Sequence, residues 1–136
     1  MIGIDTNVLI RYLTRDDEHQ SKIALNFLTK KCTVEHPAFI NRIVQCEVVW
    51  VLERAYKYSR EQIAHALEMI FRTRQFQVED QEAALSALRL FRQGKADYAD
   101  ALMGVGNKLA GCDFTMTFDR KASRLGMFQH LVSESN

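Results

Sequence analysis

Four acidic residues occupy positions from which their carboxylates could bind a metal ion. Asp5 ends a short apolar run and Asp119 follows an alternating one, so both are predicted at the ends of strands. If those strands are parallel, both carboxylates reach the same edge of a sheet. Asp100 opens a helical segment, and Glu47 stands among apolar residues. Gathered carboxylates repel one another, and a hard divalent cation makes such a cluster tolerable. Oxygen ligands alone favour Mg²⁺ or Mn²⁺ over Zn²⁺.

Glu47 lies in the segment Ile43–Tyr56, which is apolar nearly all round and is predicted to be a deeply buried helix. A lone carboxylate in that setting would be desolvated, and therefore costly, unless it is paired or coordinated. The structural alternative to a metal ligand is an ion pair with Arg11 or Arg42.

The aspartates have structural interpretations too, as helix caps. Asp5 precedes a helical segment that begins at Thr6, and Asp119 precedes a short one. Asp97 is a candidate N-cap with Asp100 at the third helical position, where a negative charge suits the helix dipole. Helix capping is therefore the structural alternative to metal binding for these aspartates.

The elements that must position these residues alternate short strands with helices. Strands are predicted at Ile2–Asp5, Ala38–Ile40, Gln75–Val78, Asp113–Phe118 and Met127–Leu131, and helices at Thr6–Leu13, Asp16–Lys30, Ile43–Tyr56, from Ser59 onward, Asp80–Gln93, Asp97–Ala110 and from Asp119 to near Gly126. This alternation predicts an α/β fold with a parallel sheet and right-handed crossovers.

Local patterns refine three of these elements. Ser59 with Gln62 predicts a capping box at a helix start. Phe114, Met116 and Phe118 alternate with threonines, which predicts a half-buried strand. The two glycines of Gly104-Val-Gly106 lie within a helical pattern, where close packing explains them better than a dinucleotide fingerprint does.

Composition limits the classes of protein. A chain of 136 residues and 15.7 kDa is predicted to be a single domain. A net charge of +1 excludes binding of nucleic acid through the overall charge of the protein, but it allows a local basic patch. No apolar run approaches a membrane span, and no export signal is visible. The three cysteines form no CxxC pair and the histidines show no ligand spacing, so we expect free thiols in the cytoplasm and no histidine metal site.

Taken in order, these residues resemble the PIN domain, and VapC-type ribonuclease toxins in particular. The resemblance rests on Ile-Gly-Ile-Asp5-Thr6-Asn7-Val-Leu, on Glu47, on Asp100 in Ala-Asp-Ala-Leu and on Thr117-Phe-Asp119. It implies one domain over residues 1–136 with a three-layer α/β/α fold around a central, mostly parallel sheet. It also implies an endoribonuclease that depends on Mg²⁺ or Mn²⁺, acts as the toxin of a toxin–antitoxin pair, is inhibited by its antitoxin and forms homodimers.

The resemblance also assigns roles to residues. By motif match, Asp5, Glu47, Asp100 and Asp119 are the catalytic, metal-binding carboxylates. Asp97 is an auxiliary residue or a cap, and Thr6, Asn7 and Thr117 are expected to hold the carboxylates by hydrogen bonds. A bound metal ion lowers the pKa of its water and neutralises charge on the phosphate, and Asp119 is the candidate to orient or deprotonate that water.

Basic residues near the last acidic position are candidates for RNA binding. Arg120, Lys121 and Arg124 directly follow Asp119 and could hold phosphates, although a solvated helix face is the alternative. Other basic groups, including the one that contains Lys95, are interpreted as solvated faces.

Two other function classes remain. One is a non-catalytic PIN-like module that binds RNA or protein. The other is a Mg²⁺-dependent phosphohydrolase, against which Asn7 stands where a second aspartate would be needed.

Overall fold

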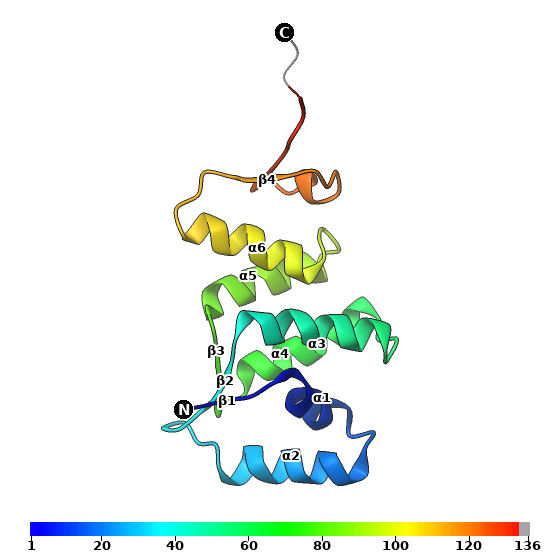
Figure 1. Cartoon of the computed structure of the whole chain (residues 1–136), viewed down its shortest axis with the longest axis vertical. Coiled ribbons are helices and arrows are strands. Elements are labelled where there is room, and N and C mark those ends of the chain that lie inside the picture. The colour runs from blue at the N-terminus through cyan, green and yellow to red at the C-terminus, as the bar shows by residue number, and fades with distance from the viewer. Residues whose placement is uncertain (134–136) are drawn as a thin grey trace. The chain divides into compact units, whose positions relative to one another are not determined.

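The computed structural model describes residues 1–133 of the chain (Figure 1). The chain divides into two compact units, the first spanning Met1–Gln81 and the second starting at Glu82. Each unit has its own parallel strand pairing, and each is described by itself below.

The first unit holds a three-stranded parallel sheet in the order β1-β2-β3. Its elements in chain order are β1 (Ile2–Gly3), α1 (Thr6–Thr14), α2 (Glu18–Lys30), β2 (Ala38–Ile40), α3 (Arg42–Arg54), α4 (Arg60–Arg72) and β3 (Phe76–Val78). The register pairs Ile2 with Ala38, and Ala38 with Phe76. Because the pairing is parallel, the three strands end at the same edge of the sheet.

Side-chain caps start all four helices of this unit. The acceptors Asp5, Asp17, Asn41 and Ser59 each bind a backbone N–H in the first turn of α1, α2, α3 and α4 respectively. At α4 the side chain of Gln62 returns the bond to the cap, so the predicted capping box is confirmed. A cap of this kind stabilises a helix by about 1 kcal/mol.

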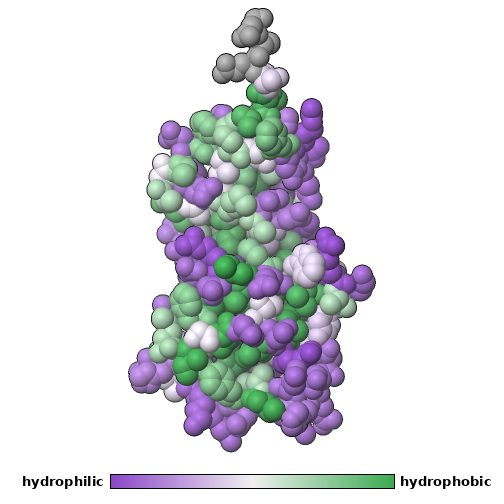
Figure 2. Space-filling view, in the orientation of Figure 1, coloured by the Kyte–Doolittle hydropathy of each residue, from purple (hydrophilic) through white to green (hydrophobic). Residues whose placement is uncertain are grey.

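The prediction that α3 is buried all round is wrong for one of its faces. Ile43 is 69% exposed and Trp50 is 58% exposed, and Glu47 between them is exposed as well. The opposite face packs toward α1 and α4 and buries Val44, Gln45, Val48, Val49 and Leu52. Apolar composition showed how hydrophobic the helix is but not which face its neighbours cover. Apolar residues reach the surface among hydrophilic ones on the face shown in Figure 2.

Helix α2 begins two residues later than predicted, because Asp17 is its cap rather than part of its first turn. Ile23, expected in the apolar stripe of this helix, is 57% exposed, whereas Ala24 and Leu28 are buried as predicted. The stripe that faces α1 is therefore narrower than the sequence pattern indicates.

The second unit contains two helices and a two-stranded parallel sheet. Its elements are α5 (Gln81–Arg92), which begins at the boundary between the units, α6 (Tyr98–Leu109), β4 (Thr115–Thr117), the 3-10 turn η1 (Ala122–Arg124) and β5 (Phe128–His130). Gly94 and Gly111 follow the two helices with φ of +74° and +104°, the left-handed conformation that ends a helix and favours glycine.

Strand β4 presents the opposite face from the one predicted to be buried. Phe114, Met116 and Phe118 are exposed, the last of them to 76%, whereas Thr115 and Thr117 are half-buried. The threonine face lies toward α6, and the side-chain amide of Asn107 donates to the Thr115 hydroxyl at 3.0 Å. Alternation in the sequence located the strand, but hydrogen bonding to α6 decided which face turned inward.

The close packing predicted at Gly104 of α6 is confirmed. A Cβ atom at this position would lie 2.5 Å from the ring of Phe128 and 2.6 Å from the sulfur of Met127. The glycine therefore allows the helix to approach the segment that leads into β5, rather than another helix.

The α/β class with parallel strand pairing is confirmed, since every strand pair among residues 1–133 is parallel. The expected free thiols are confirmed too, and burial raises the pKa of the Cys32 and Cys46 thiols. Within the described part of the chain, none of the helices combines the length and apolarity that a membrane span requires.

Candidate active site

The predicted acidic residues fall into two groups, one in each unit. Asp5 and Glu47 belong to the first unit and are called the first-unit pair. Asp97, Asp100 and Asp119 belong to the second unit and are called the second-unit set.

Asp5 lies two residues after the end of β1 and caps α1. Its Oδ1 accepts the backbone N–H of Val8 at 3.2 Å, and its side chain is exposed. The capping interpretation is therefore confirmed. The cap leaves the Oδ2 atom of Asp5 without a hydrogen-bond partner among the described residues, so the carboxylate can still bind a ligand.

Glu47 is held by Thr6, the residue that follows Asp5. The Thr6 hydroxyl donates to Oε1 of Glu47 at 2.9 Å, which joins the start of α1 to α3. The carboxylate is exposed rather than desolvated, so the expected energetic cost of burying it does not arise. The predicted role of Thr6 in holding a carboxylate by a hydrogen bond agrees with this contact.

The two arginines considered as partners of Glu47 bind other carboxylates instead. Arg11 pairs with Asp16 at 3.2 Å, and Arg42 pairs with Asp80 at 3.0 Å. The structural ion pair proposed for Glu47 is therefore wrong, since each arginine has a closer acidic partner.

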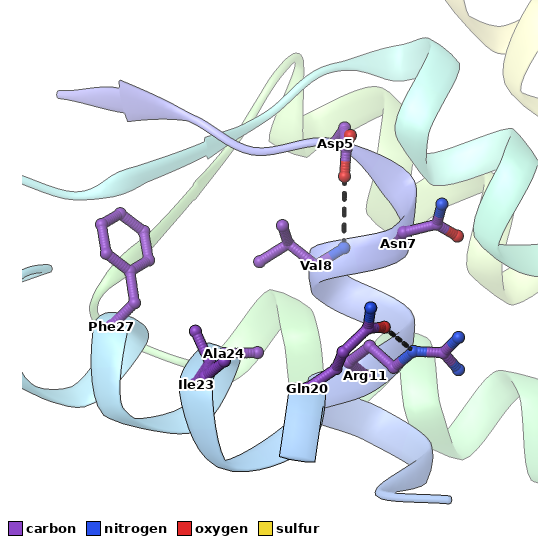
Figure 3. A pocket seen from close by; sticks show the side chains of 8 residues that line it. All are labelled: Asp5, Asn7, Val8, Arg11, Gln20, Ile23, Ala24 and Phe27. Carbon is purple, nitrogen blue, oxygen red and sulfur yellow. Dashed lines mark hydrogen bonds between the residues drawn. The ribbon is translucent and has the colours of Figure 1, made fainter. Parts of the chain in front are cut away.

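A pocket of about 490 Å³ lies beside Asp5, between α1 and α2 (Figure 3). Four of its eight lining side chains are apolar, and Asp5 and Val8 lie on one side of it with Phe27 on the other. At the end of the pocket away from Phe27, Nε of Arg11 donates to Oε1 of Gln20 at 2.7 Å. Asn7 also lines this pocket, but its side chain makes no hydrogen bond to a carboxylate among residues 1–133.

In the second-unit set, Asp97 occupies the N-cap position of α6 without acting as a cap. Its side chain makes no hydrogen bond to the first turn of the helix. Oδ1 of Asp97 instead lies 3.4 Å from Nζ of Lys121. Of the two roles considered for Asp97, the cap is therefore found in position but not in side-chain hydrogen bonding.

Asp100 is half-buried in the first turn of α6. Desolvation raises its pKa, the negative charges of Asp97 and Asp119 raise it further, and the positive charge of Lys121 opposes them. These three carboxylates are thus close enough to repel one another. A cation would relieve that repulsion.

Asp119 lies two residues after the end of β4, as Asp5 does after β1. Its Oδ1 accepts the backbone N–H groups of Lys121 at 2.8 Å and Ala122 at 3.4 Å, and so holds the turn that leads into η1. The helix expected to start directly after Asp119 is reduced to this short turn. Thr117 accepts the backbone N–H of Asp119 at 3.0 Å, so it holds the main chain at this position rather than the carboxylate.

The basic residues after Asp119 are exposed and differ in their surroundings. Lys121 contacts Asp97, and together with Arg124 it lines a pocket that also includes Lys95. Arg120 is exposed outside that pocket. Lys95 was interpreted from the sequence as part of a solvated face, and its separation of 26 positions from Lys121 gave no sign that the two share a pocket.

Among the described residues, no three His, Cys, Asp or Glu side chains gather in a way that could hold a metal ion. The donors that are present are exposed or half-buried carboxylates, the ligand type that Mg²⁺ and Mn²⁺ prefer.

Comparison with known proteins identifies the family. The model of the PIN domain matches residues 2–126, a range that contains every residue of both acidic groups. The chain is also 28% identical, over 123 residues, to a VapC ribonuclease of Aquifex aeolicus (strain VF5), and the match covers 90% of each protein. The expected PIN-type α/β fold is confirmed by the family match. The chain therefore belongs to the PIN domain family.

Proposed function

We propose that this protein is a Mg²⁺- or Mn²⁺-dependent endoribonuclease that acts as the toxin of a toxin–antitoxin pair. The observation that carries the proposal is the family match, because it spans all the acidic positions in the expected order. Similarity to a VapC ribonuclease over nearly the whole chain supports RNA as the substrate class. We also treat residues 1–136 as one PIN domain, since the family model continues across both units.

Asp5, Glu47, Asp100 and Asp119 are the proposed metal ligands. The donor chemistry fits Mg²⁺ or Mn²⁺, because all four side chains offer carboxylate oxygens and none is fully buried. Desolvation and the negative charges of Asp97 and Asp119 together raise the pKa of Asp100, which is a second sign that this region gains from a bound cation. When bound, the metal ion would supply a water of lowered pKa and would neutralise charge on the phosphate.

The protein's own residues position these groups. The Val8 N–H fixes Asp5, the Thr6 hydroxyl fixes Glu47, and two backbone N–H groups fix Asp119. Ligands held in this way lose little freedom on binding a cation, which raises affinity. Asp119 is the proposed group that orients or deprotonates the attacking water, with Asp97 as an auxiliary residue.

Partners follow from the same proposal. Arg120, Lys121 and Arg124 would contact RNA phosphates, and an antitoxin would cover the acidic site. A homodimer is the expected assembly. The cytoplasm is the expected location, consistent with three free thiols.

The test is cleavage of a total cellular RNA pool by purified protein freed of any antitoxin, with Mg²⁺, Mn²⁺ or EDTA. We expect discrete fragments only with a metal ion. The control is Asp5→Asn, which keeps the cap because asparagine caps a helix as well as aspartate does. This variant should lower cleavage by about 100-fold or more, because one metal ligand loses its charge.

Two outcomes would contradict the nuclease. If well-folded protein shows no metal-dependent cutting but retains RNA affinity, the non-catalytic binding module is favoured. If it hydrolyses a small phosphate ester and leaves RNA intact, the phosphohydrolase is favoured. Cutting that persists in Asp5→Asn would reveal a contaminating nuclease.

A further inference from the structure

The second unit carries a basic pocket beside the second-unit acidic set. The pocket has a volume of about 360 Å³ and is lined by Gly94, Lys95, Lys121, Arg124 and Leu125. Its lining contains three cationic side chains and no carboxylate. In a chain whose net charge is only +1, such a concentration of positive charge is local rather than general.

The three cations come from two separate segments that the fold holds in place. Lys95 follows α5, where the backbone N–H of Gly94 binds the Phe91 carbonyl and that of Lys95 binds the Leu90 carbonyl. The φ of +74° at Gly94 permits this turn. Lys121 and Arg124 come from the segment of η1, where the carboxylate of Asp119 accepts the backbone N–H groups of Lys121 and Ala122.

Of the three cationic side chains in this pocket, one has an acidic partner among the described residues. Lys121 has an acidic partner, Asp97 at 3.4 Å. Neither Lys95 nor Arg124 has an ion-pair or side-chain hydrogen-bond partner within residues 1–133, and both are exposed. Cations that share a pocket repel one another unless an anion joins them, so the pocket has the electrostatic character of an anion site.

Lys121 joins this pocket to the second-unit set. Its ammonium group contacts Asp97 and its backbone N–H binds Asp119, while the same residue lines the pocket. An anion in the pocket would therefore lie next to the carboxylates proposed to bind metal. A chain with regularly spaced phosphates can occupy both places at once, which a free phosphate ion cannot.

We propose that Lys95, Lys121 and Arg124 form a subsite that binds a non-scissile phosphate of single-stranded RNA and sets how the strand lies across the acidic site. This inference rests on the proposed nuclease function and adds Lys95 to it. Phosphate contacts fix register and carry no sequence information themselves. The subsite should therefore strengthen binding of all sequences equally.

Binding is measured in the Asp5→Asn background, which does not consume the RNA, by fluorescence anisotropy with a labelled single-stranded oligonucleotide that the wild-type protein cuts. Lys95→Gln and Arg124→Gln should each weaken affinity by about tenfold, the loss expected for one charge-assisted hydrogen bond. The slope of log affinity against log salt should fall by about 0.7 for each contact removed. Both side chains are exposed, so folding should be unaffected.

The matched control is Lys108→Gln. It removes the same charge from an exposed position of the same unit, outside the pocket. Lys108→Gln should change neither the affinity nor the salt slope. In the active protein, the pocket variants should raise KM and leave kcat nearly unchanged, because the subsite acts on strand binding.

The outcomes separate this inference from the proposed function. If the wild-type protein cuts RNA but the pocket variants match Lys108→Gln in affinity, salt slope and KM, the subsite is disproved and the nuclease stands. If the wild-type protein neither binds nor cuts RNA, the proposed function fails and the subsite fails with it. A fall in kcat at unchanged KM would also overturn the subsite, since it would place Lys95 or Arg124 in the chemical step.

Discussion

In the first unit, Asp5 and Glu47 each accept a hydrogen bond from a neutral donor, a backbone N–H and a hydroxyl. The second-unit set is arranged differently. Desolvation raises the pKa of Asp100, the negative charges of Asp97 and Asp119 raise it further, and the positive charge of Lys121 partly offsets them. Hydrogen bonds thus orient the first-unit pair before any ligand binds. In the second-unit set, the negative charges of Asp97 and Asp119 repel that of Asp100, and a bound cation would reduce this repulsion.

The largest effect that tests this difference is expected from Asp100→Asn. Cleavage should fall by about 100-fold, because a proposed ligand loses its charge. In metal-free buffer the variant should nevertheless melt at a higher temperature than the wild type, since a desolvated and repelled carboxylate has been neutralised. Cleavage assays and thermal denaturation in EDTA measure the two effects.

The pH at which Asp100→Asn is compared with the wild type decides whether the substitution stabilises the fold. The pKa of Asp100 is raised in the folded state above its ordinary value of 3.8, so the fold favours the protonated form. The stability that this group contributes is present at low pH and is lost as pH rises through the folded-state pKa. The advantage of Asp100→Asn should therefore appear above about pH 4 and disappear below it. A variant less stable than wild type at pH 7 would contradict the repulsion.

Thr6→Val should produce the next largest effect, on the first-unit pair. It removes the hydroxyl that orients Glu47 while nearly preserving side-chain shape. We expect about tenfold weaker apparent affinity for Mg²⁺, as measured from the metal dependence of cleavage. Thr6→Ser keeps the donor and should retain most of the affinity. A loss in Thr6→Ser with none in Thr6→Val would mean that Thr6 acts by packing rather than through its hydroxyl.

Gly104→Ala tests whether the position of α6, and with it Asp100, depends on close packing. The added Cβ would clash with Phe128 and Met127, and the overpacking should outweigh the gain in helix propensity. We expect a net loss of about 1 kcal/mol in the free energy of unfolding, measured by urea denaturation. Gly126→Ala, which has open space at Cβ, is the control and should be nearly neutral.

The smallest effect is expected from Asp16→Asn in the first unit. Hydrogen bonds from Tyr56 and Thr14 lower the pKa of Asp16, and Arg11 adds to this. A lowered pKa stabilises the fold at pH values above the ordinary 3.8, and this contribution is lost as pH falls through the folded-state value. The variant should have a slightly lower melting temperature at pH 7 and the same one near pH 2. Greater stability than wild type at pH 7 would contradict this network.

Prediction from the sequence succeeded for features that depend on residues close together in the chain. Ser59 and Gln62 specify a capping box within four residues, and Gly94 ends α5 through its own backbone freedom. The order of strands and helices, and the acidic positions at strand ends, follow from short-range patterns as well. These features need no knowledge of which distant segments meet.

The sequence patterns did not predict which face of a helix or strand is buried, or which distant side chains contact each other. Trp50 and Phe118 are apolar yet exposed, because burial depends on which neighbour covers each face. Glu47 binds Thr6 rather than an arginine, and Lys95 shares a pocket with Arg124, through contacts between segments far apart in the chain. The sequence by itself determined the element types, the capping box at Ser59 and the identity of the acidic residues, since these depend on neighbouring residues. Only the tertiary structure decided which faces are buried and which charges meet, because those depend on long-range packing.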